Sequence, residues 1–203
     1  MVHHVRKEYA ALAWSYERRW RRYLSVTHEK TLNALGETPA STRLLDVGCG
    51  TGRMLATLHA RRPDLTLIGL DASEAMLEQA PAATAGIDWV HGNLNALPLS
   101  DASVHTIISC SALHYLDDPQ QALHEMRRIL VHDGVLVLTD WRTEHLLTAL
   151  RCVRLRWLRR PLGHVLSTAE ALSLLRRARF QPQSVERYSV AGWGLFTVRA
   201  SAA

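Results

Sequence analysis

Three glycines alternate with other residues between an apolar run and a predicted helix, in the stretch Leu44-Leu45-Asp46-Val47-Gly48-Cys49-Gly50-Thr51-Gly52-Arg53. Glycine lacks Cβ and tolerates positive φ, so the backbone of such a loop can turn sharply and lie close to a ligand. A dinucleotide-binding loop has its third glycine one residue later, where this chain has Arg53. The motif therefore indicates a nucleotide-like ligand and argues against a dinucleotide.

Three further apolar runs end in residues that could contact the same ligand. The second run ends at Asp71, the third leads into 92–99, and the fourth ends in 109–115. An acid at the end of the second strand of a nucleotide-binding α/β fold accepts hydrogen bonds from ribose hydroxyls. Asp71-Ala72-Ser73-Glu74 also has the spacing of a helix cap. We favour ribose binding because the glycine motif precedes it.

The elements that must position these residues alternate along the middle of the chain. Apolar runs predict strands at 43–47, 65–70, 87–91, 104–109 and 135–139, with helices starting at Arg53 and Ser73 and a further helix over 119–130. Continuous apolar strands separated by helices indicate a parallel sheet that is covered on both faces. The carboxyl ends of such strands border the ligand crevice, so the candidate residues should meet there.

The two ends of the chain add helices and a hairpin. Apolar residues at helical spacing predict one or two amphipathic helices over about 5–35. Residues 142–179 have no strand pattern and are predicted as helices broken at Pro161 and Gly163, the last starting with a capping box at 167–170. Two β-rich runs, 184–190 and 193–199, predict an antiparallel hairpin at the sheet edge.

Four ordered motifs resemble those of the seven-stranded, Rossmann-like (class I) S-adenosylmethionine-dependent methyltransferases, in particular the enzymes that act on small molecules, lipids or quinones. They are Leu44–Gly52, Gly69–Leu77, Gly92–Leu99 and Ala112–Leu116, and the resemblance covers about residues 40–140. It implies a three-layer α/β fold with strand order 3-2-1-4-5-7-6 and an antiparallel last strand. Length and composition predict a single domain over 1–203. Its expected parts are an N-terminal helical lid (1–40), a cofactor-binding core (41–140), a helical acceptor or lid insertion (141–180) and a C-terminal hairpin (181–203).

The resemblance also implies which residues hold S-adenosylmethionine. Gly48 and Gly50 would approach its methionine part, Asp46 would shape the loop, and Asp71 would hold the ribose. The remaining cofactor-binding residues implied are Tyr16 as a lid contact, Ala72 and Met76 against the adenine face, Asn93 and the amide of Leu94 at the adenine edge, and Cys110. The family usually has Asp where this chain has Asn93, whose side-chain oxygen can still accept a hydrogen bond but carries no charge.

From the resemblance, His114 is the one histidine that we nominate as a catalytic base. It follows the fourth strand, where the family's acceptor pocket opens. Methyl transfer is an in-line displacement that depends mainly on proximity and alignment. A base is needed only when the acceptor arrives protonated. A histidine at this position can also simply pack or shape the pocket, and that alternative stays open.

The acceptor must be recognised outside the shared core, where arginines are concentrated. The net charge is +5, and the arginine-rich stretches are 18–22 and 151–160. Apolar residues at helical spacing accompany the second stretch, a pattern suited to a small hydrophobic or lipid-like acceptor and to peripheral contact with an anionic membrane. A solvated helix face has the same pattern. An RNA-directed methyltransferase and a non-catalytic cofactor-binding module are the alternatives, and nucleic acid is the less favoured partner.

Composition excludes several other classes. The chain is 47% hydrophobic and 21% charged, as in ordinary globular domains, and has no apolar run near the roughly 20 residues that span a bilayer. Its start lacks the apolar stretch of a signal peptide, so we expect a cytoplasmic protein. The three cysteines, Cys49, Cys110 and Cys152, are far apart, so we expect neither a disulfide framework nor a metal site.

Overall fold

The computed structural model describes residues 2–80, 86–160 and 162–203, with side chains from Glu17 onward. Its centre is a seven-stranded sheet with the order β3-β2-β1-β4-β5-β7-β6. The strands are β1 (Arg43–Val47), β2 (Thr66–Asp71), β3 (Ile87–His91), β4 (Val104–Cys110), β5 (Leu130–Trp141), β6 (Phe180–Val190) and β7 (Trp193–Ala202). Neighbouring strands pair in parallel except that β7 runs antiparallel to both β5 and β6. The predicted fold class and strand order are confirmed.

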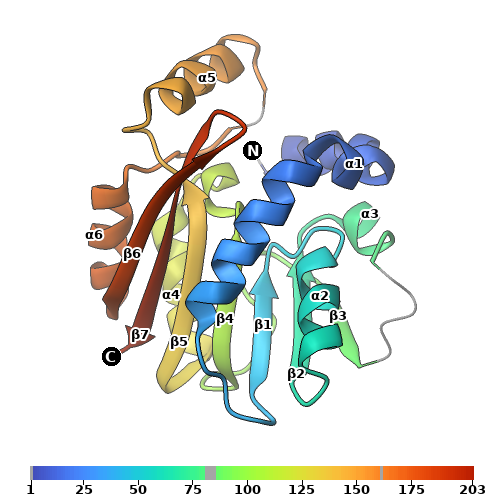
Figure 1. The fold of residues 1–203 in the computed structure, drawn as a ribbon, viewed down its shortest axis with the longest axis vertical. Helices are drawn as coiled ribbons and strands as arrows, with labels where there is room; N and C mark the ends of the chain where they lie inside the picture. Colours follow the sequence, from blue (N-terminus) through green and yellow to red (C-terminus); the bar gives the residue numbers. More distant parts are fainter. Residues whose placement is uncertain (1, 81–85, 161) are drawn as a thin grey trace.

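Helices cover both faces of this sheet, as Figure 1 shows. On one face, α2 (Arg53–Arg61) and the end of α1 (Val2–Leu35) pack on Leu44, Leu67 and Val137. On the other face, α4 (Pro119–Ile129) and α6 (Thr168–Arg177) pack on Leu45, Leu136 and Val198. Successive strand side chains point to opposite faces, so adjacent Leu44 and Leu45 serve different cores. Strands buried on both sides explain why their sequences read as continuous apolar runs.

The long helix α1 lies diagonally across the front of the sheet and continues past the carboxyl ends of β1 and β4 (Figure 1). Thr27 and Thr31 are fully buried, and the Thr31 hydroxyl lies 2.7 Å from the Thr139 hydroxyl on β5. Tyr23 and Leu24 belong to a third apolar cluster with Trp141. The buried contacts of its second half fix α1 on the sheet, so its first half is carried over the ligand edge.

The segment between β5 and β6 divides into two helices with different surroundings. Helix α5 (Leu146–Trp157) projects beyond the carboxyl edge of the sheet, whereas α6 packs against the sheet (Figure 1). The predicted capping box at the start of α6 is present, because Ser167 and Glu170 bond reciprocally. Within the predicted insertion at 141–180, only α5 and the loop that follows it are therefore left as candidates for a lid.

Some elements differ in length from the sequence prediction. Strand β5 begins five residues before the predicted 135, because Leu130 pairs with Val104 through a register shift ahead of the main ladder. Helix α3 (Glu74–Leu77) is a single turn. Across the described residues, we find no helix whose length and apolar character would let it cross a membrane.

Candidate functional site

The glycine loop lies at the carboxyl end of β1, where the Asp71 side chain fastens it. Backbone N–H groups of Gly48 and Cys49 both donate to the Leu70 carbonyl, at 2.7 and 3.0 Å. The Gly50 N–H donates to Asp71 Oδ2 at 2.8 Å, and the Ser73 N–H donates to Oδ1 at 2.8 Å. Asp71 thus orders both the glycine loop and the turn before α3. The N-cap of α3 is Ser73, so the cap predicted at Asp71 is wrong. Each Asp71 oxygen keeps a second lone pair, and ribose binding stays a prediction.

Gly48, Gly50 and Gly52 all have positive φ, for different local reasons. A Cβ on Gly52 would lie 2.3 Å from the Trp89 ring, and one on Gly48 would lie 2.5 Å from Ala112 Cβ. A Cβ on Gly50 would meet nothing within 4 Å. The Trp89 indole lies against the loop, so only a residue without a Cβ fits at position 52. Gly50 borders open space, as a residue facing a ligand should.

Asp46 lies at the floor of the site and is 1% exposed. Neither of its carboxylate oxygens has a hydrogen-bond partner in the described structure, so it does not shape the loop through direct hydrogen bonds. Burial, and then the negative charge of Asp71, raise the pKa of Asp46 well above its ordinary value. A ligand bearing positive charge would stabilise the ionised carboxylate. An orphaned buried acid beside an open glycine loop fits the amino and sulfonium groups of S-adenosylmethionine.

Helix α1 is tied to the glycine loop by Glu17. Its carboxylate accepts hydrogen bonds from the Thr51 hydroxyl at 2.8 Å and from the Arg53 guanidinium at 3.1 Å. These contacts hold the helix against the loop, and the role of a lid stays a prediction. The side chain of Tyr16, the expected lid contact, lies outside the described residues. The sequence did not predict this role for Glu17, because an acid next to the arginine-rich stretch 18–22 has no pattern that indicates contact with the glycine loop.

Another α1 residue, His28, links stability to pH. Burial, reinforced by the charge of Arg53, lowers the pKa of His28 from 6.5 to about 4. Between these values the unfolded chain binds a proton that the folded chain does not, so stability falls as the pH drops through this window. The shift corresponds to at most about 3 kcal/mol. We expect His28→Gln to flatten the fall in the free energy of urea unfolding between pH 7 and pH 4. His132→Gln, on an 80% exposed side chain, should leave the slope unchanged. Equal slopes for His28→Gln and the parent would contradict this assignment.

The residues expected around the adenine line the edge next to β2 and β3. Met76 is buried on α3, Ala72 is half-buried, and Leu94 is buried in the loop after β3. Asn93 is exposed, and its side-chain oxygen accepts the Asn95 N–H at 3.0 Å. This bond fixes the orientation of the Asn93 amide while its NH₂ group and the second lone pair of its oxygen stay available.

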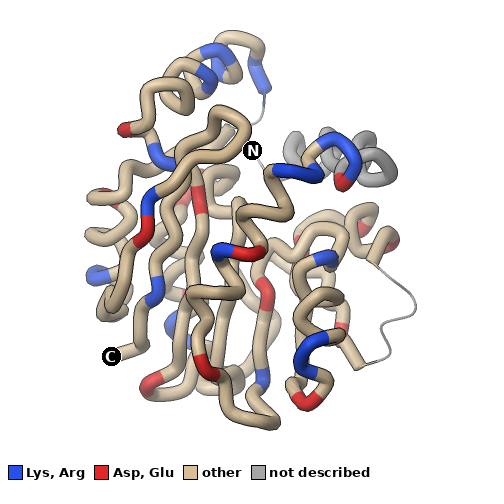
Figure 2. Tube along the Cα trace, in the orientation of Figure 1, with Lys and Arg blue, Asp and Glu red and all other residues tan. Residues whose placement is uncertain are grey.

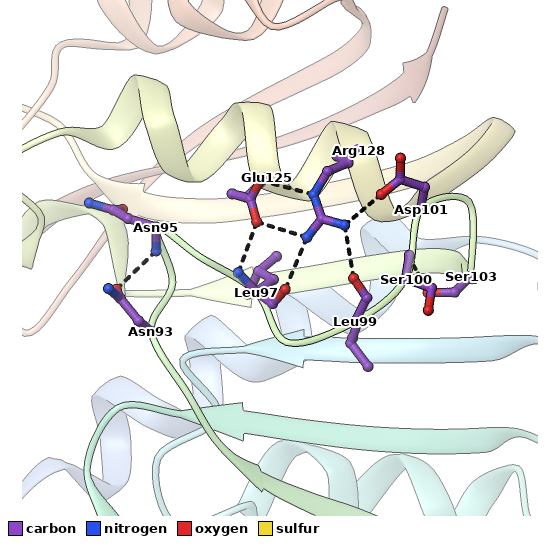
Figure 3. Close-up of polar contacts among 9 residues, drawn as sticks. All are labelled: Asn93, Asn95, Leu97, Leu99, Ser100, Asp101, Ser103, Glu125 and Arg128. Atoms are coloured by element: carbon purple, nitrogen blue, oxygen red, sulfur yellow. Dashed lines mark hydrogen bonds and ion pairs between the residues drawn. The ribbon is translucent and has the colours of Figure 1, made fainter.

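Arg128 on α4 clamps the loop that carries Asn93 and Leu94, as Figure 3 shows. Its guanidinium donates to the carbonyls of Leu97 and Leu99 at 2.9 and 2.8 Å. It also pairs with Glu125 and Asp101, and Glu125 accepts the Leu97 N–H at 2.9 Å. Hydrogen bonding from Arg128 lowers the pKa of Glu125. The clamp positions residues 93–99 from below without touching the ligand edge.

We expect Arg128→Ala to weaken both the fold and this edge of the site. The variant loses two charge-assisted bonds to backbone carbonyls and leaves Glu125 without its cationic partner, which should cost about 2 kcal/mol of unfolding free energy. A freed loop should weaken the binding of S-adenosylhomocysteine by about fivefold, since the loop must then be ordered on binding. Urea unfolding and calorimetric titration measure the two effects, with exposed Arg61→Ala as control. Unchanged stability and affinity would show that the clamp has no positioning role.

His114 is buried beside Asp140, at the carboxyl ends of β4 and β5. The structure places His114 Nδ1 2.5 Å from Asp140 Oδ1, and the His114 backbone N–H donates to Oδ2 at 3.2 Å. A carboxylate can only accept, so it takes the Nδ1 hydrogen of a neutral ring and leaves the lone pair on Nε2. That Nε2 is buried and has no hydrogen-bond partner in the described structure. This arrangement is the one a general base requires.

Aromatic side chains enclose this histidine. Its ring stacks on Trp141 at 3.8 Å between centroids, and Trp141 stacks on Trp193 of β7 at 4.0 Å. The Trp141 indole donates to the Tyr23 hydroxyl at 2.7 Å, which lies 2.6 Å from the Ser111 hydroxyl. Sequence reasoning missed Asp140, Trp141, Tyr23 and Trp193, although Asp140 ends an apolar run next to the strand of His114.

Cys110 belongs to the α1 side of the same edge. Its thiol interacts with the hydroxyls of Thr31 and Thr27, and burial raises its pKa to about 11. The thiol is therefore protonated at neutral pH and suited to packing. The next residue, Ser111, has a φ of 60°, a conformation that is costly outside glycine and is concentrated at functional sites.

A cavity of about 460 Å³ lies between α5, the loop after it and α6. Its lining residues are Asp117, Thr143, Cys152, Arg156, Gly163, His164, Val165 and Glu170. The Gly163 N–H donates to the His114 carbonyl at 2.8 Å, so the cavity wall adjoins the histidine. The lining is mixed in charge and polar, as a site for a polar group would be.

Comparison with known proteins identifies the core of the chain. Residues 45–138 match the family described as "Methyltransferase domain". An uncharacterized methyltransferase of Mycobacterium tuberculosis is 30% identical over 123 residues, covering 60% of this chain and 61% of the relative. The ubiquinone/menaquinone biosynthesis C-methyltransferase of Desulfotalea psychrophila is 32% identical over 126 residues, covering 61% of this chain and 48% of the relative. The chain spans from 33% to 61% of the length of the first curated relatives it matches.

Among solved structures, the fold matches over almost the whole chain. A chain from the complex of the Haloferax volcanii methyltransferase activator Trm112 superimposes with a TM-score of 0.80 and 21% identity. The match covers 96% of this chain and 97% of that one. At this identity the likeness establishes the fold, including elements on both sides of the matched domain.

Proposed function

Residues 45–138 of the chain form a Rossmann-like methyltransferase domain, and from this premise we propose that the protein transfers a methyl group from S-adenosylmethionine to a small hydrophobic or lipid-like acceptor. The strongest support for the methyl donor comes from the glycine loop and the two acids beside it. The glycine loop, fastened by Asp71, lies above the unpartnered buried carboxylate of Asp46. A cationic, nucleoside-containing ligand satisfies both groups, because the ribose hydroxyls suit Asp71 and the positive methionine end suits Asp46.

The same site has a place for each part of this cofactor. Gly48 and Gly50 approach the methionine portion, Asp71 binds the ribose, and Met76 with Ala72 packs on the adenine. The side chain of Asn93 and the backbone of Leu94 read the adenine edge, which the Arg128 clamp supports from behind. Cys110 contributes to the neighbouring wall, and Tyr16 stays a predicted lid contact. Helix α1, held by Glu17, shields the loop from water.

When bound, S-adenosylmethionine supplies an electrophilic methyl group on a sulfonium. The chain's own contribution is alignment, exclusion of water and removal of a proton from the acceptor. His114 Nε2 receives that proton, because Asp140 fixes the ring in the tautomer with its lone pair on Nε2. Stacking between His114, Trp141 and Trp193 keeps the ring in one plane.

Three features support a hydrophobic or lipid-like acceptor. Aromatic rings surround His114, the outer face of α5 is apolar, and the Desulfotalea relative is named for quinone biosynthesis. RNA recognition would normally need an additional basic platform that tracks a backbone. A non-catalytic binding module is the second alternative, and the buried His114 with an unpartnered Nε2 favours an enzyme over it.

Transfer of labelled methyl tests the acceptor class directly. The protein is incubated with methyl-tritiated S-adenosylmethionine and, in separate reactions, a demethylated quinone, a phospholipid extract or total RNA. We expect label in the organic phase and none in RNA, with the His114→Asn variant much slower. Label in RNA would overturn the acceptor class while leaving the methyl donor intact. Tight cofactor binding with no transfer to any of the three would support the binding module instead.

A further inference from the structure

Helix α5 lies at one end of the molecule (Figure 1), and it exposes apolar side chains. In the described part of the chain, every large hydrophobic side chain that is exposed, apart from Val185, lies in or directly after this helix. They are Leu146, Leu147, Leu150, Val153, Trp157 and Leu158. Leu150 is 57% exposed and Trp157 is 81% exposed. Apolar patches of this kind mark interaction surfaces in monomeric proteins.

The opposite side of α5 is firmly attached, so the exposed side has a defined direction. Thr148 and Cys152 are buried, and the Thr148 hydroxyl accepts the Gly194 N–H at 2.6 Å. Arg151 lies over the Trp193 ring at 4.8 Å and donates to the Ala191 carbonyl at 2.9 Å. The helix therefore cannot roll its apolar side inward without breaking these contacts.

Positive charge surrounds the apolar side. Arg154, Arg156 and Arg159 are exposed on α5 and just after it, and residues 145–166 contain no Asp or Glu. Arg19, Arg21 and Arg22 on α1 are also exposed. The described start of α1 carries blue segments in Figure 2 and lies toward the same end of the molecule as α5. Apolar residues flanked by arginines on a helix at a molecular surface are the pattern of an interfacial helix.

We propose that α5 docks this end of the protein on the surface of an anionic lipid bilayer. The apolar row would enter the boundary between headgroups and acyl chains, and the arginines of α5 and α1 would contact lipid phosphates. Charge complementarity favours an anionic bilayer over other binding partners of α5. A second copy of the chain would bring the same arginines against each other without acids from 145–166. A nucleic acid would pair with the arginines and could stack on Trp157, but it would leave the exposed aliphatic side chains, such as Leu146 and Leu150, in water.

Docking of this kind goes beyond methyl transfer and does not depend on it. It would orient the carboxyl edge of the sheet, with His114 and the cavity under α5, toward the bilayer. An acceptor dissolved in the membrane could then approach the site without crossing water. Since binding and catalysis are separate measurements, failure of either leaves the other standing.

Sedimentation with lipid vesicles tests the docking. The probes are vesicles of phosphatidylcholine alone and of phosphatidylcholine mixed with phosphatidylglycerol, each at low and high salt. We expect binding to the anionic vesicles only, weakened by salt. Each arginine near an anionic surface contributes about fivefold, so Arg154→Gln/Arg159→Gln should weaken partitioning by about 25-fold. Trp157→Ser should weaken it by about tenfold, because its buried apolar area is lost.

Two matched control variants test whether vesicle binding depends on the α5 surface or only on the overall charge and hydrophobicity of the protein. Arg176→Gln/Arg177→Gln removes the same charge from exposed positions on α6, and Val185→Ser removes an exposed apolar side chain from β6. Both should bind vesicles like the parent, and all variants should keep their affinity for S-adenosylhomocysteine. Equal loss in the α5 and α6 double variants would overturn the proposal. So would absence of vesicle binding, a dimer abolished by Trp157→Ser, or tighter binding to RNA than to anionic vesicles at the same salt.

Discussion

Replacing Asp71 by alanine weakens binding of S-adenosylhomocysteine by at least about 100-fold, since two charge-assisted hydrogen bonds worth about 1.5 to 3 kcal/mol each are lost with the ribose. The glycine loop also loses the anchor at Gly50, so the effect extends to the methionine end of the ligand. Calorimetric titration of the purified variant measures the change. Asp88→Ala, which removes an exposed acid from neighbouring β3, should bind like the parent.

Loss of the fold could imitate this result, because the carboxylate of Asp71 also holds Ser73. Urea unfolding of the same preparation shows whether the variant is native. Asp71→Asn provides a second test, since it keeps the size of the side chain but turns an amide NH₂ toward a backbone donor. A folded Asp71→Ala and Asp71→Asn with unchanged affinity would reduce Asp71 to an anchor of the loop and of Ser73.

Replacing His114 by asparagine lowers kcat by about 100-fold or more while leaving affinity for S-adenosylhomocysteine unchanged, because general-base catalysis typically contributes 10²- to 10⁴-fold. The acid limb of the kcat profile against pH should disappear in this variant. His132→Gln, an exposed histidine at the far end of β5, should behave like the parent. A normal rate and pH profile in His114→Asn would return the residue to a packing role.

Asp140 acts through His114, so its replacement tests positioning rather than proton transfer itself. Asp140→Asn removes the charge and can turn an NH₂ donor toward Nδ1, which favours the tautomer with the proton on Nε2. We expect kcat to fall by about 100-fold and the pH profile to shift, whereas Asp140→Glu should recover part of the rate. A loss of stability alone, with kcat and its pH profile unchanged, would make Asp140 structural.

Local pattern was sufficient for the central strands and for the backbone of the site, whereas the order of the strands in the sheet came from the family resemblance. The buried parallel strands have apolar runs because both faces are covered, and the glycine loop and Asp71 stand at strand ends that topology brings together. The capping box at Ser167 is also a purely local device, and it is present where predicted.

What sequence could not supply is contact between distant segments. Trp89 underlies Gly52, Glu17 holds Thr51, and Asp140 orients a histidine 26 residues earlier in the chain. Each pairing depends on sheet register, which no local periodicity records. The start of β5 was missed for a similar reason, since Leu130 joins the sheet only through a register shift opposite Val104. The split of 141–180 into a projecting α5 and a packed α6 likewise depends on which helix finds an apolar partner.

The central claim is that S-adenosylmethionine is the ligand that binds above Asp46 and beside Asp71. Calorimetric titration of the intact chain with S-adenosylhomocysteine, and in parallel with NAD, tests it directly. We predict one bound S-adenosylhomocysteine per chain and no heat of binding with NAD, because the loop has its third glycine at Gly52 over Trp89 rather than one residue later. Binding of NAD without binding of S-adenosylhomocysteine would contradict the central claim.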